Sequence, residues 1–179
     1  HGTANALLAP YVCKFNAQKH PYHMGTFSQY KYPQAFERYV ELGELIGVKG
    51  KNDEETFKNW IKALEQLKVD IDIPATIWDW LCEAHPEKSA EDWEKEFLAA
   101  VDQMSEWAFH DACTGANPVY PMIGELKQVY LRAFYGDEKF VEKYGDVLCV
   151  EVNNPTDTHA AYPLGFAAEI GEDKVGGFK

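Results

Sequence analysis

The chain has 179 residues, of which 46% are hydrophobic, 14% aromatic and 26% charged, and this is enough apolar material for one or at most two compact cores. Its formal net charge of −12 repels phosphate backbones and anionic lipid, so nucleic-acid binding is excluded as an expected function. The sequence contains neither the roughly 18 consecutive apolar residues of a membrane span nor a signal peptide. Because it begins at His1 inside an apolar segment, we expect a globular piece of a longer polypeptide.

Two helices are expected in the first third of the chain. Apolar residues recur at three- and four-residue spacing from Asn5 to Phe15, which predicts a helix kinked by Pro10. Residues 20–33 lack a sustained period and are expected to form a loop. A second stripe predicts a helix over 34–46 that ends at a left-handed glycine. Its members are Phe36, Tyr39, Val40, Leu42, Leu45 and Ile46.

The clearest helix follows residue 52. Either Asn52 or Asp53 can cap it, because both side chains can accept hydrogen bonds from backbone amides of the first helical turn. A long apolar stripe follows. The members of the stripe are Phe57, Trp60, Ile61, Leu64 and Leu67. Pro74 is then expected to open another helix, since its missing N–H is tolerated at a first helical position.

Two further helices are expected before the sequence changes character. Ser89 and Asp92 resemble a capping box, and residues 105–113 either continue the helix that follows or start a short one. Residues 114–118 are expected to interrupt the helical structure, and a last strong helix is expected over 121–134. Beyond Gly136 the pattern over Val147–Val152 is strand-like, which predicts an extended or β-containing arm.

The cysteines indicate a compartment rather than a chemistry. Cys13, Cys82, Cys113 and Cys149 lie far apart, with neither a C-x-x-C pair nor a short disulfide framework. We therefore expect reduced thiols in a reducing compartment. A zinc site made of cysteines needs ligands paired at short spacing, and that spacing is absent.

Two histidine pairs have the spacing of metal ligands. His20 and His23 are three residues apart in the expected loop, where two imidazoles without a third ligand are more simply surface histidines. Glu106 and His110 are four apart on an expected helix, which brings a carboxylate and an imidazole to one face. An ordinary side-chain pair is the simpler interpretation of that spacing.

Motifs at both ends of the first 136 residues give the sequence a family resemblance. The first twelve residues, HGTANALLAPYV, resemble the HG-x-ANA-LL-x-P-x-V segment of iron-containing (group III) alcohol dehydrogenases. Four further segments look like the C-terminal alcohol dehydrogenase portion of bifunctional aldehyde/alcohol dehydrogenases. They are FSQY (27–30), PQA (33–35), DACTGANP (111–118) and YPMIGELK (120–127). The resemblance divides the chain into a helical, metal-side part over 1–136 and an unmatched acidic tail or arm over 137–179.

The resemblance implies a mainly α fold, the helical C-terminal part of the iron-dependent alcohol dehydrogenase (dehydroquinate synthase-like) fold. In that family one Asp and three His hold the metal, and the histidine of the HG motif, here His1, is one of these ligands. The implied cofactors are Fe(II), or alternatively Zn(II), and NAD(H) bound mainly by a part that precedes the motif. The metal acts as a Lewis acid on the substrate oxygen. Val119 stands where the family typically carries an arginine, so an anion contact or ion pair of that arginine is not expected here.

Two functions are compatible with this resemblance. The chain is either the C-terminal portion of an NAD(H)- and iron-dependent enzyme that interconverts acetaldehyde, or a similar short aldehyde, and ethanol, or a non-catalytic scaffolding subunit of a larger assembly. A single ligand does not hold a catalytic metal, so the enzyme would need its N-terminal part for activity. The implied partners are the remainder of the enzyme or a companion chain, a homo-oligomer or filament, and a short aldehyde or alcohol. The implied location is the cytoplasm, with an organelle matrix as the alternative.

Overall fold

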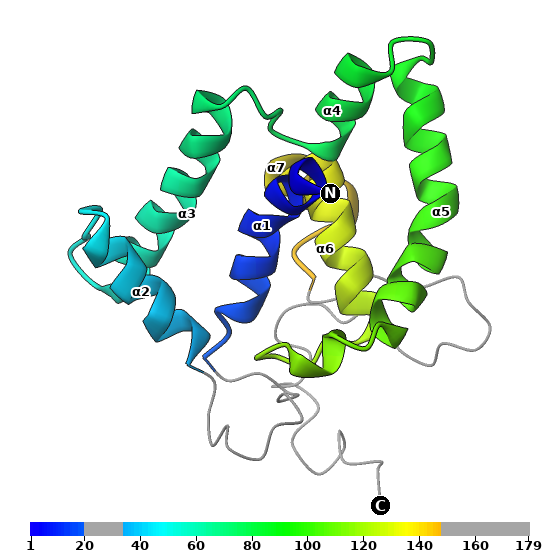
Figure 1. Cartoon of the computed structure of the whole chain (residues 1–179). Helices are drawn as coiled ribbons and strands as arrows, with labels where there is room; N and C mark the ends of the chain where they lie inside the picture. Colours follow the sequence, from blue (N-terminus) through cyan, green and yellow to red (C-terminus); the bar gives the residue numbers. More distant parts are fainter. Residues whose placement is uncertain (20–33, 148–179) are drawn as a thin grey trace, which may run out of the picture.

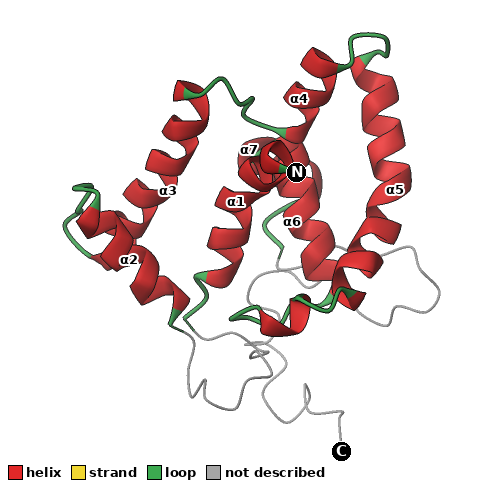
Figure 2. Cartoon of the chain, in the orientation of Figure 1, coloured by secondary structure: helices red, strands yellow, loops and turns green. Residues whose placement is uncertain are grey.

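The computed structural model describes residues 1–19 and 34–147, and its regular elements there are helices (Figures 1 and 2). In chain order they are α1 (Gly2–Asn16), α2 (Ala35–Leu45), α3 (Asp53–Asp70), α4 (Ile77–Ala84), α5 (Ala90–His110), the short 3-10 helix η1 (Thr114–Ala116), α6 (Ile123–Tyr135) and α7 (Asp137–Tyr144). The expectation of a mainly α fold is therefore confirmed. None of the described helices is both long and apolar enough to cross a membrane.

Helices α2 and α3 form an antiparallel pair held by aromatic side chains. Tyr39 of α2 stacks on Trp60 of α3 with ring centroids 4.6 Å apart, and Phe36 contacts Phe57 at 5.6 Å. Gly43 lies at the closest approach of the two helices, since a Cβ there would lie 3.0 Å from Thr56 Cγ2. The absence of a side chain at Gly43 therefore lets the two backbones pack tightly.

The main core lies where α4, α5, α6 and α7 meet. Phe134 of α6 is fully buried and stacks on Phe97 of α5, with centroids 4.0 Å apart, and on Trp78 of α4, at 5.5 Å. Phe140 of α7 and Leu131 of α6 are also fully buried in this cluster. Burial of large aromatic rings is the principal apolar contribution to the stability of this half of the body.

Helix α1 lies between the α2–α3 pair and the main core (Figure 1). Its Tyr11 packs against Val129 and Ala133 of α6 in a second, smaller cluster. The first turn of α1 is mostly exposed, and Leu7 is the first buried residue of the helix. The helix is therefore held on the body chiefly through its middle and its C-terminal half.

Most helix termini agree with the sequence analysis. Asn52 is the N-cap of α3 and accepts a hydrogen bond from the Glu55 amide at 2.9 Å. Ser89 caps α5 in the same way by accepting from the Asp92 amide at 3.2 Å, and α5 continues without interruption to His110. Gly47 follows α2 with φ +81°, the left-handed conformation expected after that helix.

The start of α4 was predicted wrongly. The helix begins at Ile77, and its N-cap is Thr76, whose hydroxyl accepts a hydrogen bond from the Asp79 amide at 3.0 Å. Pro74 lies two residues before that cap. A threonine that can satisfy a free first-turn amide determines the helix start here, whereas a proline at a first helical position satisfies none.

The residues after Gly136 also differ from expectation. Instead of entering an extended arm at once, residues 137–144 form helix α7, whose Phe140 belongs to the main core. Acidic residues occupy its first turn and a lysine its last, and both suit the helix dipole. The expected loop at 20–33, and residues 148–152 of the expected strand, lie outside the described part of the chain.

Candidate functional site

His1 lies exposed at the beginning of α1. Its carbonyl oxygen accepts a hydrogen bond from the Asn5 amide at 3.1 Å, so the residue belongs to the first turn of the helix. Among residues 1–19 and 34–147, no group of three or more His, Cys, Asp or Glu side chains could hold a metal ion. The described residues therefore do not by themselves fit the metal of the resembled family, although His1 can offer one imidazole ligand.

The second candidate pair, Glu106 and His110, lies on α5 as expected. The Glu106 carboxylate accepts a hydrogen bond from Gln103 Nε2 at 3.0 Å, and the His110 ring contacts Phe109 edge to face. Neither residue belongs to a group of three or more His, Cys, Asp or Glu side chains that could hold a metal in the described part of the chain. His20 and His23 lie outside the described residues.

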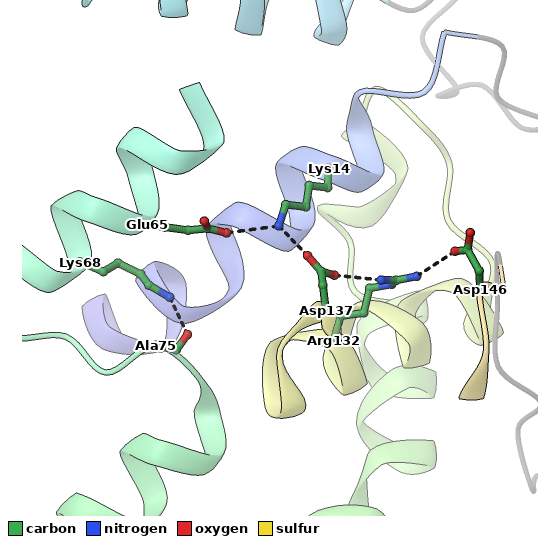
Figure 3. Close-up of polar contacts among 7 residues, drawn as sticks. All are labelled: Lys14, Glu65, Lys68, Ala75, Arg132, Asp137 and Asp146. Carbon is green, nitrogen blue, oxygen red and sulfur yellow. Dashed lines mark hydrogen bonds and ion pairs between the residues drawn. The ribbon is translucent and has the colours of Figure 1, made fainter. Parts of the chain in front are cut away.

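A polar cluster that the sequence analysis missed connects α1, α3, α6 and α7 (Figure 3). Lys14 Nζ lies 2.7 Å from Asp137 Oδ2 and 3.2 Å from Glu65 Oε1. The other oxygen of Asp137, Oδ1, lies 2.9 Å from Arg132 Nη1, and Arg132 Nη2 lies 3.7 Å from Asp146 Oδ1. Asp137 therefore bridges a lysine of α1 and an arginine of α6.

Lys14, Arg132, Asp137 and Asp146 of this cluster line a cavity of about 230 Å³. Tyr11 and Lys14 come from α1, Glu125 and Arg132 from α6, and Asp137 from α7. Burial raises the pKa of Glu125, and a hydrogen bond from the Met122 amide opposes that shift. Burial raises the pKa of Tyr11 as well, and the nearby Asp137 raises it further.

Asp137 responds to two opposing influences in this cavity. Burial favours its neutral form, but the hydrogen bonds and charges of Lys14 and Arg132 outweigh burial and lower the pKa of the carboxyl. The charged carboxylate is thus the stable form, and each of its oxygens has a cationic donor. Sequence alone offers no signal for this contact, because 123 positions separate Lys14 from Asp137.

The DACTGANP segment is held by a pair of amide side chains. Asn117 Nδ2 lies 2.6 Å from Asn16 Oδ1, and Asn16 Nδ2 lies 3.1 Å from Asn117 Oδ1, which joins the end of α1 to the segment before α6. Asn117 also donates to the Val119 carbonyl oxygen at 2.5 Å. Val119 is only 2% exposed, so this residue is part of the apolar interior.

Several large apolar side chains point away from the body. Leu45 is 81% exposed and Trp107 68% exposed, and Ile46 and Leu67 are more than half exposed. Leu45, Ile46 and Leu67 belong to the apolar stripes that the periodicity identified, yet they are exposed in the described part of the chain.

Comparison with known proteins gives a family match that coincides with the helical body. The sequence model of the Fe-containing alcohol dehydrogenase family, C-terminal, matches residues 1–134. The bifunctional aldehyde-alcohol dehydrogenase AdhE of Escherichia coli (strain K12) is 43% identical over 138 residues, which are 76% of this chain and 14% of that protein. The aldehyde-alcohol dehydrogenase of Clostridium acetobutylicum is 38% identical over 133 residues, 74% of this chain and 14% of that protein.

A shorter relative shows the same match. The NADPH-dependent butanol dehydrogenase of Clostridium saccharobutylicum is 31% identical over 138 residues, which cover 77% of this chain and 29% of that protein. The chain thus spans about a seventh to less than a third of the length of these relatives.

Proposed function

The chain belongs to the Fe-containing alcohol dehydrogenase family, and it corresponds to the helical C-terminal part of that family's fold. From this premise we propose what the chain does. It is the C-terminal portion of an NAD(H)- and iron-dependent enzyme that interconverts acetaldehyde, or a similar short aldehyde, and ethanol. The observation that carries the proposal is the family match over 1–134, which includes the intact HG motif and every helix of the body up to α6.

His1 has one role in this proposal. Its imidazole is a ligand of Fe(II), or alternatively Zn(II), and the remaining ligands come from the part of the enzyme that these residues do not include. The intact HG motif within the family match over 1–134 supports this role. A neutral imidazole suits either metal, which supplies Lewis-acid polarisation of the substrate oxygen when bound.

The partners follow from what the helical body lacks. A catalytic metal site needs about three protein ligands and an open position, and no such set exists among the described residues. The remainder of the enzyme, or a companion chain, supplies these ligands and the nicotinamide site. The proposed assembly also includes other copies of the enzyme, in a homo-oligomer or filament.

We propose that the protein acts in the cytoplasm, with an organelle matrix as the alternative. The wide spacing of its four cysteines, without a short disulfide framework, supports a reducing compartment.

The isolated chain provides the first test of the proposal. Residues 1–179 are purified, loaded with Fe(II) and assayed with NADH and acetaldehyde against a metal-free control. We expect no reduction above the control, because one imidazole does not hold the metal. Metal-dependent reduction by the isolated chain would contradict the requirement for a second part.

The natural assembly that contains this chain distinguishes the enzyme from a scaffold. We expect it to contain about one iron or zinc per chain, as metal analysis would show, and to reduce acetaldehyde with NADH. An assembly with neither metal nor reductase activity would contradict the proposal of an enzyme and favour the non-catalytic scaffolding subunit.

A further inference from the structure

Helix α1 is attached to the body unevenly along its length. Its first turn is mostly exposed, Leu7 is the first buried residue, Tyr11 packs on α6, and Lys14 forms ion pairs with Glu65 and Asp137. Six positions separate His1 from Leu7, the first buried residue of the helix, a distance of about 9 Å along a helix. A tilt of about 10° of the helix about this residue would move His1 by about 1.6 Å.

A displacement of that size matters for a metal ligand. Metal–ligand distances in proteins vary by only about 0.2 Å, and binding geometry must be held to within about 0.5 Å. The position of a ligand on α1 thus depends on what prevents the helix from tilting. The carboxylate of Asp137 is suited to this task, because it touches α1 and α6 at once (Figure 3).

Lys14 and Arg132 together form a carboxylate-binding site. Their donor nitrogens approach different oxygens of Asp137, at 2.7 and 2.9 Å, and both side chains line the same cavity. Arg132 is further restrained by Phe140 of α7, whose ring centroid lies 4.3 Å from the guanidinium carbon. Helix α7 in turn is anchored in the core by Phe140, so Asp137 sits on a fixed support.

We propose that Asp137 is a positioning residue: its carboxylate occupies the two-cation site made by Lys14 and Arg132 and thereby fixes α1, with His1 at its end, on the helical body. Residue 137 lies beyond the family match, which ends at residue 134. The chain's own α7 thus supplies the bridge between two helices of the matched part. The importance of this bridge for metal ligation rests on the proposed function, whereas the fixation of α1 does not.

Hydrogen exchange of the 179-residue chain, without metal, tests the fixation of α1. Asp137→Asn keeps the shape of the side chain and removes its charge, and Glu138→Gln is the matched control at the exposed neighbouring position. We expect amides of residues 2–16 to exchange at least tenfold faster in Asp137→Asn, while amides of α5 exchange as in the wild type. Loss of one charge-assisted hydrogen bond is enough for about a tenfold change. Glu138→Gln should leave both helices unchanged.

A small carboxylate provides the second arm of the test. In Asp137→Ala the side chain is gone and the two cations remain, so we expect acetate to slow exchange in α1 again and chloride at equal ionic strength to have no such effect. The proposal is overturned if α1 in folded Asp137→Asn exchanges within twofold of the wild type, if α1 and α5 accelerate equally, or if acetate acts no better than chloride. Should Asp137→Ala fail to fold, the comparison of Asp137→Asn with Glu138→Gln decides.

These results are separable from the proposed function. If Asp137→Asn accelerates hydrogen exchange in α1 tenfold and the natural assembly lacks metal, Asp137 still fixes α1, but the proposal of an enzyme is refuted. If hydrogen exchange in α1 is unchanged in Asp137→Asn while the metal of the assembly depends on His1, only the positioning role of Asp137 is refuted.

Discussion

Replacing Phe134 by alanine should cost a large share of the stability of the helical body. The ring is fully buried and lies between Phe97, at 4.0 Å, and Trp78, at 5.5 Å. Phe→Ala in a packed interior costs about 3–5 kcal/mol from lost transfer energy and the cavity left behind. The two aromatic contacts place the expected loss near the upper end of that range, since stacked pairs contribute about 0.5–1.5 kcal/mol beyond burial.

Urea unfolding followed by circular dichroism at 222 nm measures this loss. The free energy of unfolding is compared at a constant m-value, so a shift of the midpoint reports stability rather than compactness. Leu45→Ala is the control, because Leu45 is 81% exposed and an exposed substitution should stay within about 0.5 kcal/mol. A loss below about 1 kcal/mol for Phe134→Ala, or losses of equal size in the two variants, would refute the assignment of the core.

Three further predictions concern a cap, a buried position and a charge. Asn52→Ala removes the acceptor of the Glu55 amide and should lower the free energy of unfolding by about 1 kcal/mol; an unchanged urea midpoint would show that the cap is not needed. Val119→Arg places a charge at a 2% exposed position and should cost more than about 2 kcal/mol, and a wild-type midpoint would mean that the segment opens to solvent. Because the net effect of its surroundings lowers the pKa of Asp137, its ionised form stabilises the fold fully above its unfolded pKa of about 4 and loses this contribution as pH falls through the folded value. Wild type should therefore lose more stability than Asp137→Asn between pH 7 and about pH 2, and equal losses would contradict the ion pairs.

Local patterns predicted the helices well where one interaction determines the terminus. Asn52 and Ser89 cap α3 and α5 because their side chains accept hydrogen bonds from residues three positions later, which a linear sequence displays directly. Pro74 misled the prediction, since proline is tolerated at a helix start without determining it. Helix α7 was missed, although Phe140 and Tyr144 have helical spacing after Gly136.

Periodicity identified apolar stripes but not what covers them. Leu45 and Leu67 have the spacing of core residues, yet both are exposed in the described part of the chain. The Lys14–Asp137 ion pair lies beyond local reasoning for a related reason. Both residues are ordinary surface charges in the sequence, and only the packing of α1 and α7 on α6 brings them together.

The metal content of His1 variants in the natural assembly tests the central claim most directly. His1→Gln removes the proposed ligand, and His110→Gln removes another exposed histidine as a control. We expect iron or zinc to fall from about one per chain to near zero in His1→Gln and to stay at the wild-type level in His110→Gln. Full metal occupancy in the folded His1→Gln assembly would contradict the assignment of His1 as a ligand.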